Sequence, residues 1–163
     1  VQVAPGVFAP VPNTDYELPQ SVNLDFQTGV AANTLVFGSI RWAEWSGTQI
    51  NSAGYPANPL VGFDNDSISY NIGVGRKFSD AFSGSISFGY EAASGGFASN
   101  LAPTDGNYSV AVGGAYDLGD GLEISGGVRY VMIGNADTQI GPATASFSDN
   151  SAIGVGVKVG YSF

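Results

Sequence analysis

The chain of 163 residues contains no cysteine and no histidine, and its 14 acidic and 5 basic residues give a net charge of −9. This composition excludes a disulfide, a cysteine nucleophile, a Ser-His-Asp triad and a zinc site of the usual nitrogen and sulfur ligands, and the negative charge argues against a nucleic-acid partner. Charged residues make up only 12% of the chain, about half the usual quarter for soluble domains. That deficit is typical of a membrane β-barrel or of a secreted glycine-rich β fold.

In chain order, an extended segment comes first and seven strands follow it. Residues 1–20 contain four prolines and are predicted to form an extended external segment, not a strand. Apolar and polar residues then alternate with the period of a strand over residues 21–30, 34–45, 67–76, 82–91, 108–116, 122–132 and 152–163. These lengths approach the roughly 9–11 residues of a tilted transmembrane strand. In the second segment Arg41 and Glu44 fall on opposite faces, so its upper end is expected to leave the membrane or to contain a bulge.

The connections between these strands alternate in length. Short connections span residues 31–33, 77–81 and 117–121, and long ones span 46–66, 92–107 and 134–151. Outer-membrane barrels have short periplasmic turns and long extracellular loops. The sequence therefore predicts an all-β fold, an antiparallel transmembrane β-barrel segment of about seven strands, whose last strand ends in the periplasm.

Aromatic residues gather at two levels along the predicted strands. Those near the long loops are Trp42, Trp45, Tyr70, Phe88, Tyr90, Tyr108 and Tyr130, and those near the short turns are Phe78, Phe82, Tyr116, Tyr161 and Phe163. Two aromatic girdles are typical of the two membrane interfaces. The alternative is that aromatic residues simply favour strands.

The strand count predicts an incomplete barrel. A bacterial barrel has an even number of strands and begins and ends in the periplasm, whereas seven strands here place residues 1–20 outside the cell. The chain is therefore expected to be the C-terminal part of a larger barrel, preceded by an odd number of strands. Its two open edges are expected to be closed by another segment, by copies of itself or by something unrelated.

Five charged residues are predicted to face the lumen, because a basic residue facing hydrocarbon costs about 2–4 kcal/mol near the midplane. They are Asp25, Arg41, Glu123, Arg129 and Lys158. Arg129 or Lys158 is a candidate for binding a ligand carboxylate; the alternative is a cross-strand ion pair with Glu123. Seven glycines on the same face provide either space for an elongated ligand or strand curvature: Gly73, Gly75, Gly89, Gly113, Gly127, Gly154 and Gly156.

The external loops offer two weaker signals and no catalytic one. Asp64 and Asp66 are candidate calcium ligands or simply solvated acids, and Val61 and Phe63 belong to an apolar patch that either docks substrates or packs the barrel mouth. No nucleophile is accompanied by a base. We expect no enzyme activity, no cofactor and no metal.

Three segments resemble FadL-type outer-membrane transport proteins over about residues 18–163. Leu18-Pro19-Gln20-Ser21-Val22-Asn23-Leu24 is similar to the start of a strand in that family, Trp42-Ala43-Glu44-Trp45-Ser46 is similar to the end of the next strand, and the end Val157 to Phe163 also matches. The resemblance implies a 14-stranded barrel in the outer membrane of a Gram-negative bacterium, with passive uptake of long-chain fatty acids or other hydrophobic molecules. The plug and the lateral exit of that family would lie in the other half of the barrel. The alternatives are a self-assembling β fragment without transport and a general water-filled porin.

Overall fold

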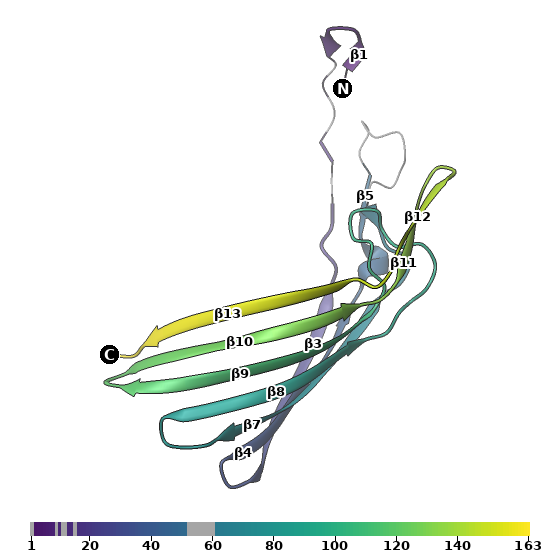
Figure 1. Ribbon diagram of the computed structural model, residues 1–163. Coiled ribbons are helices and arrows are strands. Elements are labelled where there is room, and N and C mark those ends of the chain that lie inside the picture. Colours follow the sequence, from purple (N-terminus) through teal and green to yellow (C-terminus); the bar gives the residue numbers. More distant parts are fainter. Residues whose placement is uncertain (1, 9, 11–12, 15, 52–60) are drawn as a thin grey trace.

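The computed structural model describes residues 2–8, 10, 13–14, 16–51 and 61–163 of the chain. Seven long strands form one antiparallel sheet in the order β13-β10-β9-β8-β7-β4-β3 (Figure 1). Their bounds are β3 (Ser21–Ala31), β4 (Thr34–Ala43), β7 (Ser67–Lys77), β8 (Phe82–Glu91), β9 (Asn107–Gly119), β10 (Leu122–Ile133) and β13 (Ser151–Tyr161). No helix among the described residues is long and apolar enough to cross a membrane.

The seven strands lie where the alternation predicts them, and the short turns explain where they reverse. Asn33 and Asp120 adopt positive φ angles of 57° and 52° in two of these turns, a conformation that asparagine and aspartate tolerate better than most residues. The strand predicted over 34–45 is two residues shorter, because β4 ends at Ala43 and Trp45–Gly47 forms a short 3-10 helix, η1. β4 pairs with β7 without a register shift. The C-terminal end of the predicted segment therefore leaves the sheet, and β4 contains no bulge against β7.

Short hairpins occur where the sequence predicted none. β1 (Gln2–Ala4) pairs with β2 (Val7–Phe8), which corrects the expectation that residues 1–20 contain no strand. β5 (Gln49–Ile50) pairs with β6 (Val61–Gly62), and β11 (Ala136–Ile140) pairs with β12 (Ala143–Phe147) inside two long loops. β1, β2, β5 and β6 have only two or three residues, too few for alternation of apolar and polar residues to be recognised. In β11 the three consecutive polar residues Asp137, Thr138 and Gln139 interrupt the alternation, whereas β12 alternates over only five residues and was not recognised.

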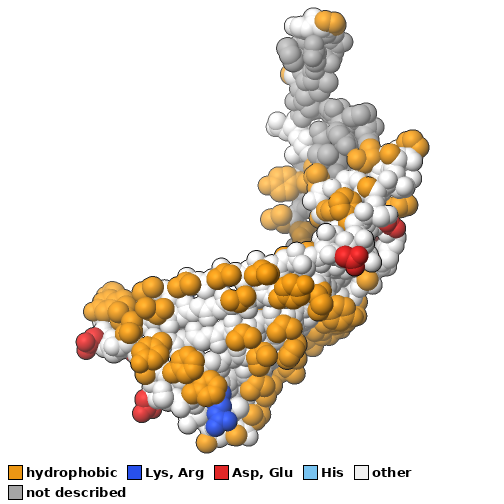
Figure 2. Space-filling model, in the orientation of Figure 1, with side chains coloured by type: hydrophobic (Ala, Val, Ile, Leu, Met, Phe, Trp, Pro, Cys, Tyr) orange, Lys and Arg blue, Asp and Glu red, His pale blue; other side chains and the backbone are white. Residues whose placement is uncertain are grey.

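The sheet forms a single layer without a packed core. Within the described part of the chain, Ala43 and Ala136 are the only buried hydrophobic residues, and no large side chain is fully buried. A soluble domain usually packs two or three layers around one core, which this sheet does not do. Most of its large apolar residues instead lie exposed on one face, where they cover the strands while charged side chains appear near the strand ends (Figure 2).

The two edge strands run in the same direction. Every neighbouring pair in the seven-stranded sheet is antiparallel, and six such steps lead from β3 to β13. No described strand pairs with the outer edge of either one. The sheet is therefore open, and a direct contact between its own edges would be parallel.

Candidate functional site

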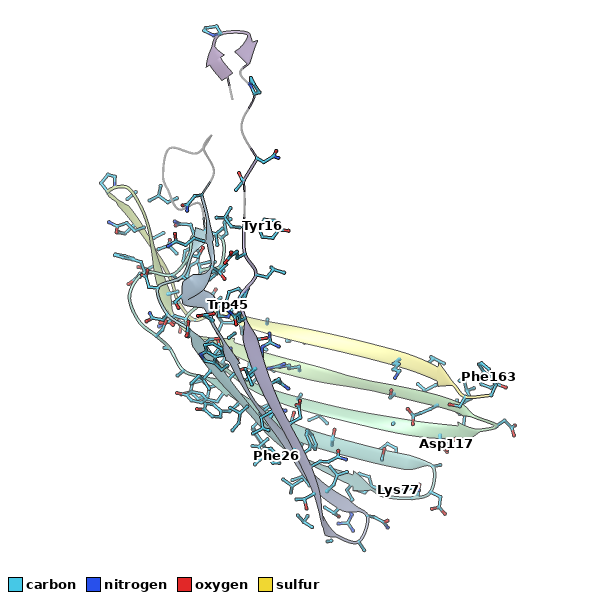
Figure 3. All side chains as sticks on the ribbon, turned by 180° about the vertical axis from the view of Figure 1, so that it is seen from behind. Tyr16, Phe26, Trp45, Lys77, Asp117 and Phe163 are labelled. Atoms are coloured by element: carbon cyan, nitrogen blue, oxygen red, sulfur yellow. The ribbon has the colours of Figure 1, made fainter. Side chains whose placement is uncertain are left out.

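The candidate site is the face of the sheet opposite the large apolar side chains. An open hollow on this face has a volume of about 1110 Å³ and touches residues from all seven strands, so the curved sheet (Figure 1) is concave on this side. We call it the turn-end hollow, because Lys77, Asp80 and Asp117 from the short turns line it. Figure 3 shows Lys77 and Asp117 at the end of the sheet remote from Trp45.

The pairing register places all five predicted luminal charges on this concave face. Asp25 lies opposite Ser39, two residues from Arg41 on β4. Glu123, Ser125 and Arg129 share a face of β10, and Lys158 lies opposite Ser125. Four of the five are divided between two hollows: Glu123 and Lys158 line the turn-end hollow, and Arg41 and Arg129 line a second hollow. Asp25 lines neither.

The second hollow, which we call the loop-end hollow, has a volume of about 370 Å³ and is strongly polar. Arg129 donates from Nη2 to Ser109 Oγ at 2.8 Å, and Arg41 donates from Nη2 to Ser21 Oγ at 3.2 Å. Each guanidinium has five N–H donors, so both retain donors for a further acceptor. Glu91 and Asn107 contribute the other long polar side chains near the loops.

The ion pair expected as the alternative role of Arg129 and Lys158 is not formed. The one ion pair in the part of the chain that the structure describes joins Lys77 Nζ to Asp80 Oδ1 at 3.7 Å. Arg129 lies opposite Ala111 and Gly154, whereas Glu123 lies opposite Asp117 and Gly160. Six residues of extended chain separate Glu123 from Arg129, roughly 20 Å along the same strand.

Two apolar residues on the concave face were missed from the sequence. Leu35 and Phe37 lie on the same face of β4 as Arg41, opposite Gly75 and Gly73. A Cβ atom at Gly73 would lie 2.4 Å from Phe37 Cζ, so the ring occupies the space that the glycine leaves. The sequence could have shown this. Leu35, Phe37 and Arg41 are separated by even numbers of residues on one strand, so their side chains point to the same face. Placing Arg41 in the lumen therefore places Leu35 and Phe37 there as well.

The aromatic residues on the opposite face form two clusters of rings. Near the long loops the ring centroids of Tyr70 and Tyr90 are 6.4 Å apart, and those of Tyr90 and Tyr108 are 5.0 Å apart. At the turn end Phe78 lies 5.5 Å from Phe82, and Tyr161 lies 6.3 Å from Phe163. Trp42, Phe88, Tyr116 and Tyr130 share the outward register of these rings.

Trp45 is placed differently from the other aromatic residues. It belongs to η1 and packs against Phe63 in the same loop, with ring centroids 5.1 Å apart. The two apolar loop residues thus have partners within the loop region: Val61 is the strand-pairing partner of Ile50, and the ring of Phe63 contacts Trp45.

Asp66 connects this loop to the end of β4 through hydrogen bonds. Its carboxylate accepts hydrogen bonds from the Ser46 hydroxyl at 2.6 Å, from the Ser46 backbone N–H at 3.2 Å and from Trp42 Nε1 at 3.2 Å. The Ser46 hydroxyl contributes most to lowering the pKa of Asp66. The two Asp66 oxygens considered for calcium are thus engaged by protein donors, and the described residues contain no group of three His, Cys, Asp or Glu placed to hold a metal.

Asp105 holds the second long loop in a similar way. Its carboxylate accepts from the Ser94 backbone N–H at 2.6 Å, from the Ser94 hydroxyl at 2.9 Å and from the Gly95 N–H at 2.7 Å. Desolvation raises the pKa of Asp105, but these hydrogen bonds outweigh it, so the pKa lies below its ordinary value of 3.8. The same loop bonds to β11, where Ala98 N donates to Asp137 O at 2.7 Å.

Acid is expected to loosen the loop over residues 92–106. Because the folded-state pKa of Asp105 is lowered, its stabilisation is fully present above the ordinary value and is lost as pH falls through the lower folded value. Hydrogen–deuterium exchange of this segment should accelerate in that range and stay slow above it. Asp105→Asn should give fast exchange at neutral pH as well, while exchange in β3 and β4, which this loop does not contact through Asp105, serves as the internal control. Equal exchange in the variant and the native chain would contradict the role of Asp105.

No protein-family model matches this chain, and no curated protein matches it. The geometry of the sheet is therefore what bears on function.

Proposed function

We propose that this chain forms part of the wall of an outer-membrane β-barrel that takes up hydrophobic molecules with an acidic end, such as long-chain fatty acids. The observation that carries the proposal is the single-layer sheet, which exposes its apolar residues on one face and buries no large side chain within the described residues. In water that face would remain exposed, whereas a bilayer covers it with hydrocarbon. The two clusters of aromatic rings suit the two interfaces of such a bilayer.

The concave face supports the second half of the proposal. At the turn end Leu35, Phe37 and Lys158 line the same hollow, and at the loop end two guanidinium groups are bonded to serine hydroxyls. A carboxylate can displace or share those weak partners, since arginine forms bidentate pairs with it. The alkyl part of the ligand can lie against the apolar side chains and the small residues between them. The mechanism is passive diffusion along a lumen screened from the bilayer.

The resemblance to FadL-type transport proteins agrees with this proposal. The seven strands correspond to half of the 14 strands that the family has, and the segments from Leu18 to Leu24 and from Trp42 to Ser46 include the start of β3 and the end of β4. The other half would complete the barrel and carry the plug and the exit of that family. We place the protein in the bacterial outer membrane on these grounds, with lipid and a hydrophobic ligand as its partners.

Replacing Arg129 is expected to weaken binding of an anionic amphiphile. A hydrogen bond to a charged group contributes about 1.5–3 kcal/mol, so Arg129→Ala should weaken dodecanoate binding by roughly 10- to 100-fold. Dodecanol, which has the same chain and no charge, should bind the variant and the native protein alike. The measurement is titration calorimetry of the intact protein in mild detergent, together with flux of both compounds into proteoliposomes.

Tyr130→Ala is the matched control for this experiment. Tyr130 follows Arg129 directly on β10, lies opposite Val110 and Ile153 in the outward register and lines neither hollow, so its loss should leave dodecanoate binding unchanged. Unchanged dodecanoate binding by Arg129→Ala would remove Arg129 from the site. Large ion conductance without saturable dodecanoate flux would favour a general porin, and a native mass built only of copies of this chain would favour a self-assembling fragment.

A further inference from the structure

We propose that the loop-end hollow binds the head group of the transported amphiphile, and that this head group is a sugar acid, in which hydroxyl groups accompany one carboxylate. This inference rests on the proposed function, because it names the class of molecule that the same concave face takes up. A sugar acid differs from the head group of a fatty acid, which offers a carboxylate alone.

The first observation is that the hollow contains hydrogen-bond acceptors without a protein donor. None of the hydrogen bonds between described residues involves the side chain of Glu91, Asn71 or Asn107, all of which line the hollow. A carboxylate only accepts hydrogen bonds, and an amide accepts through its oxygen and donates through its nitrogen. A fatty-acid carboxylate also only accepts, so it cannot satisfy Glu91 or the amide oxygens. A hydroxyl group both donates and accepts, and a ligand that fits the hollow therefore carries hydroxyl groups.

These side chains lie next to one another on the concave face. Ser69 on β7 lies opposite Glu91 on β8, which in turn lies opposite Asn107 on β9. Asn71 follows Ser69 by two residues on the same face and lies opposite Gly89. Ser69, Asn71, Glu91 and Asn107 are all half-buried. One hydroxyl, two amides and one carboxylate thus form a continuous polar floor across three strands.

The second observation is that the two guanidinium groups are too far apart to share one carboxylate. Arg129 Nη2 lies 2.8 Å from Ser109 Oγ on β9 and 3.4 Å from the place of a Cβ atom at Gly89 on β8. Arg41 extends the other way, to Ser21 on β3. β7 lies between β8 and β4, so two strand spacings, roughly 10 Å, separate those strands. One guanidinium can bind the carboxylate, and the other then faces the oxygens at the far end of the head group.

The charge of the hollow favours hydroxyl groups over an ammonium group as the donors of the ligand. The lining carries two guanidinium groups and the single carboxylate of Glu91. Asp25 lies outside the lining, where it accepts a hydrogen bond from Asn23. A head group with one negative charge neutralises the positive excess of the lining, whereas a zwitterionic head group leaves it in place.

The third observation is a path for the alkyl chain. A third hollow on the concave face has a volume of about 400 Å³ and shares Arg129 with the loop-end hollow and Ser85 and Gly113 with the turn-end hollow. Apart from Arg129, the concave side chains that line it are all serine, alanine or glycine. An alkyl chain can therefore run from the polar head group over small residues toward Leu35 and Phe37 in the turn-end hollow.

The test compares three amphiphiles with the same dodecyl chain on the intact protein in a polyoxyethylene detergent, which contains no sugar. Dodecyl glucuronide has hydroxyl groups and a carboxylate, dodecyl glucoside has hydroxyl groups alone, and dodecanoate has a carboxylate alone. Titration calorimetry should give the glucuronide a Kd at least about 10-fold lower than either of the others, because a site that binds ligand hydroxyl groups rejects an analogue that lacks them. Equal or tighter binding of dodecanoate or of the glucoside would overturn the inference.

Asn71→Leu tests the polar floor directly. Leucine has nearly the size of asparagine but neither donates nor accepts, so the glucuronide should bind this variant about 10-fold more weakly, and its preference over dodecanoate should shrink. Ile72→Leu is the matched control, because Ile72 is the next residue and lies on the outward face, opposite Gly38 and Phe88. Unchanged glucuronide binding by Asn71→Leu, or equal weakening of both acids, would overturn the contact with ligand hydroxyl groups.

Flux into proteoliposomes separates this inference from the proposed function. Preferential glucuronide binding without flux rejects uptake and keeps the sugar-acid site. Saturable dodecanoate binding and flux without a preference for the glucuronide keeps the proposed function and rejects the sugar-acid site. Absence of saturable binding for all three amphiphiles rejects both.

Discussion

Ile86→Lys should lower the folding equilibrium constant in a bilayer by roughly 30- to 1,000-fold, because a basic residue facing lipid near the midplane costs about 2–4 kcal/mol. Ile86 lies in the middle of β8 on the outward face, opposite Val74 and Val112. The lysine would have to leave this apolar surface or bring water into it. Urea titration in phosphocholine vesicles, followed by the fluorescence of Trp42 and Trp45, measures the effect.

Ser87→Lys is the control for this prediction. Ser87 follows Ile86 directly, faces the concave side and lines the loop-end hollow, where a lysine keeps its water. Because the two substitutions add the same charge at adjacent positions, their difference reports the environment of each face. Equal stability of the two variants in the bilayer would contradict the assignment of the outward face to lipid.

Gly73→Ala and Gly113→Ala should change stability in opposite directions. A methyl group at Gly73 would lie 2.4 Å from Phe37 Cζ and 2.8 Å from the backbone oxygen of Ile86, and only the ring can move away. Overpacking of this kind costs about 1–3 kcal/mol. At Gly113 the nearest atom is 3.4 Å from the added carbon, so the variant should gain about 0.5–1 kcal/mol, the usual penalty of glycine in a strand.

The same urea titration measures both glycine variants. Adding Phe37→Ala to Gly73→Ala should recover part of the loss, since the ring is then gone and only the contact with the Ile86 oxygen remains. A native-like stability of Gly73→Ala would contradict the close contact between Phe37 and the backbone of β7.

The long strands could be predicted from the sequence because each has one mainly apolar face and a turn at one end. Ser21–Ala31 and Phe82–Glu91 are found within a residue of their predicted ends, since alternation over ten residues is a strong local signal. Trp45 could not be placed in this way. Alternation does not show whether the chain continues as a strand after Ala43 or turns away. Trp45 lies in η1 instead of in β4, and its ring contacts Phe63.

The sequence predicted which face of the sheet carries the candidate site, but it did not predict the contacts between the side chains on that face. Parity alone places Arg41 and Arg129 on one side of the sheet. The separation of Glu123 from Arg129 is six residues along one strand and follows from the sequence. The residues that lie beside each arginine on neighbouring strands depend on the register between strands, which sequence alternation leaves undefined in steps of two residues. The same limitation explains why Ser109 was not recognised as the partner of Arg129.

The missing core has a consequence for how this protein can diverge over time. A side chain in a packed interior must match the shape of fixed neighbours, but one that faces a fluid bilayer has only to be apolar. On the proposed function Val155, Ile86 and Val128, which are exposed on the outward face, contact lipid and should therefore tolerate exchange among aliphatic residues of any shape. We expect distant relatives to share hydropathy period, turn glycines and loop-length alternation with this chain while retaining little residue identity along the outward face.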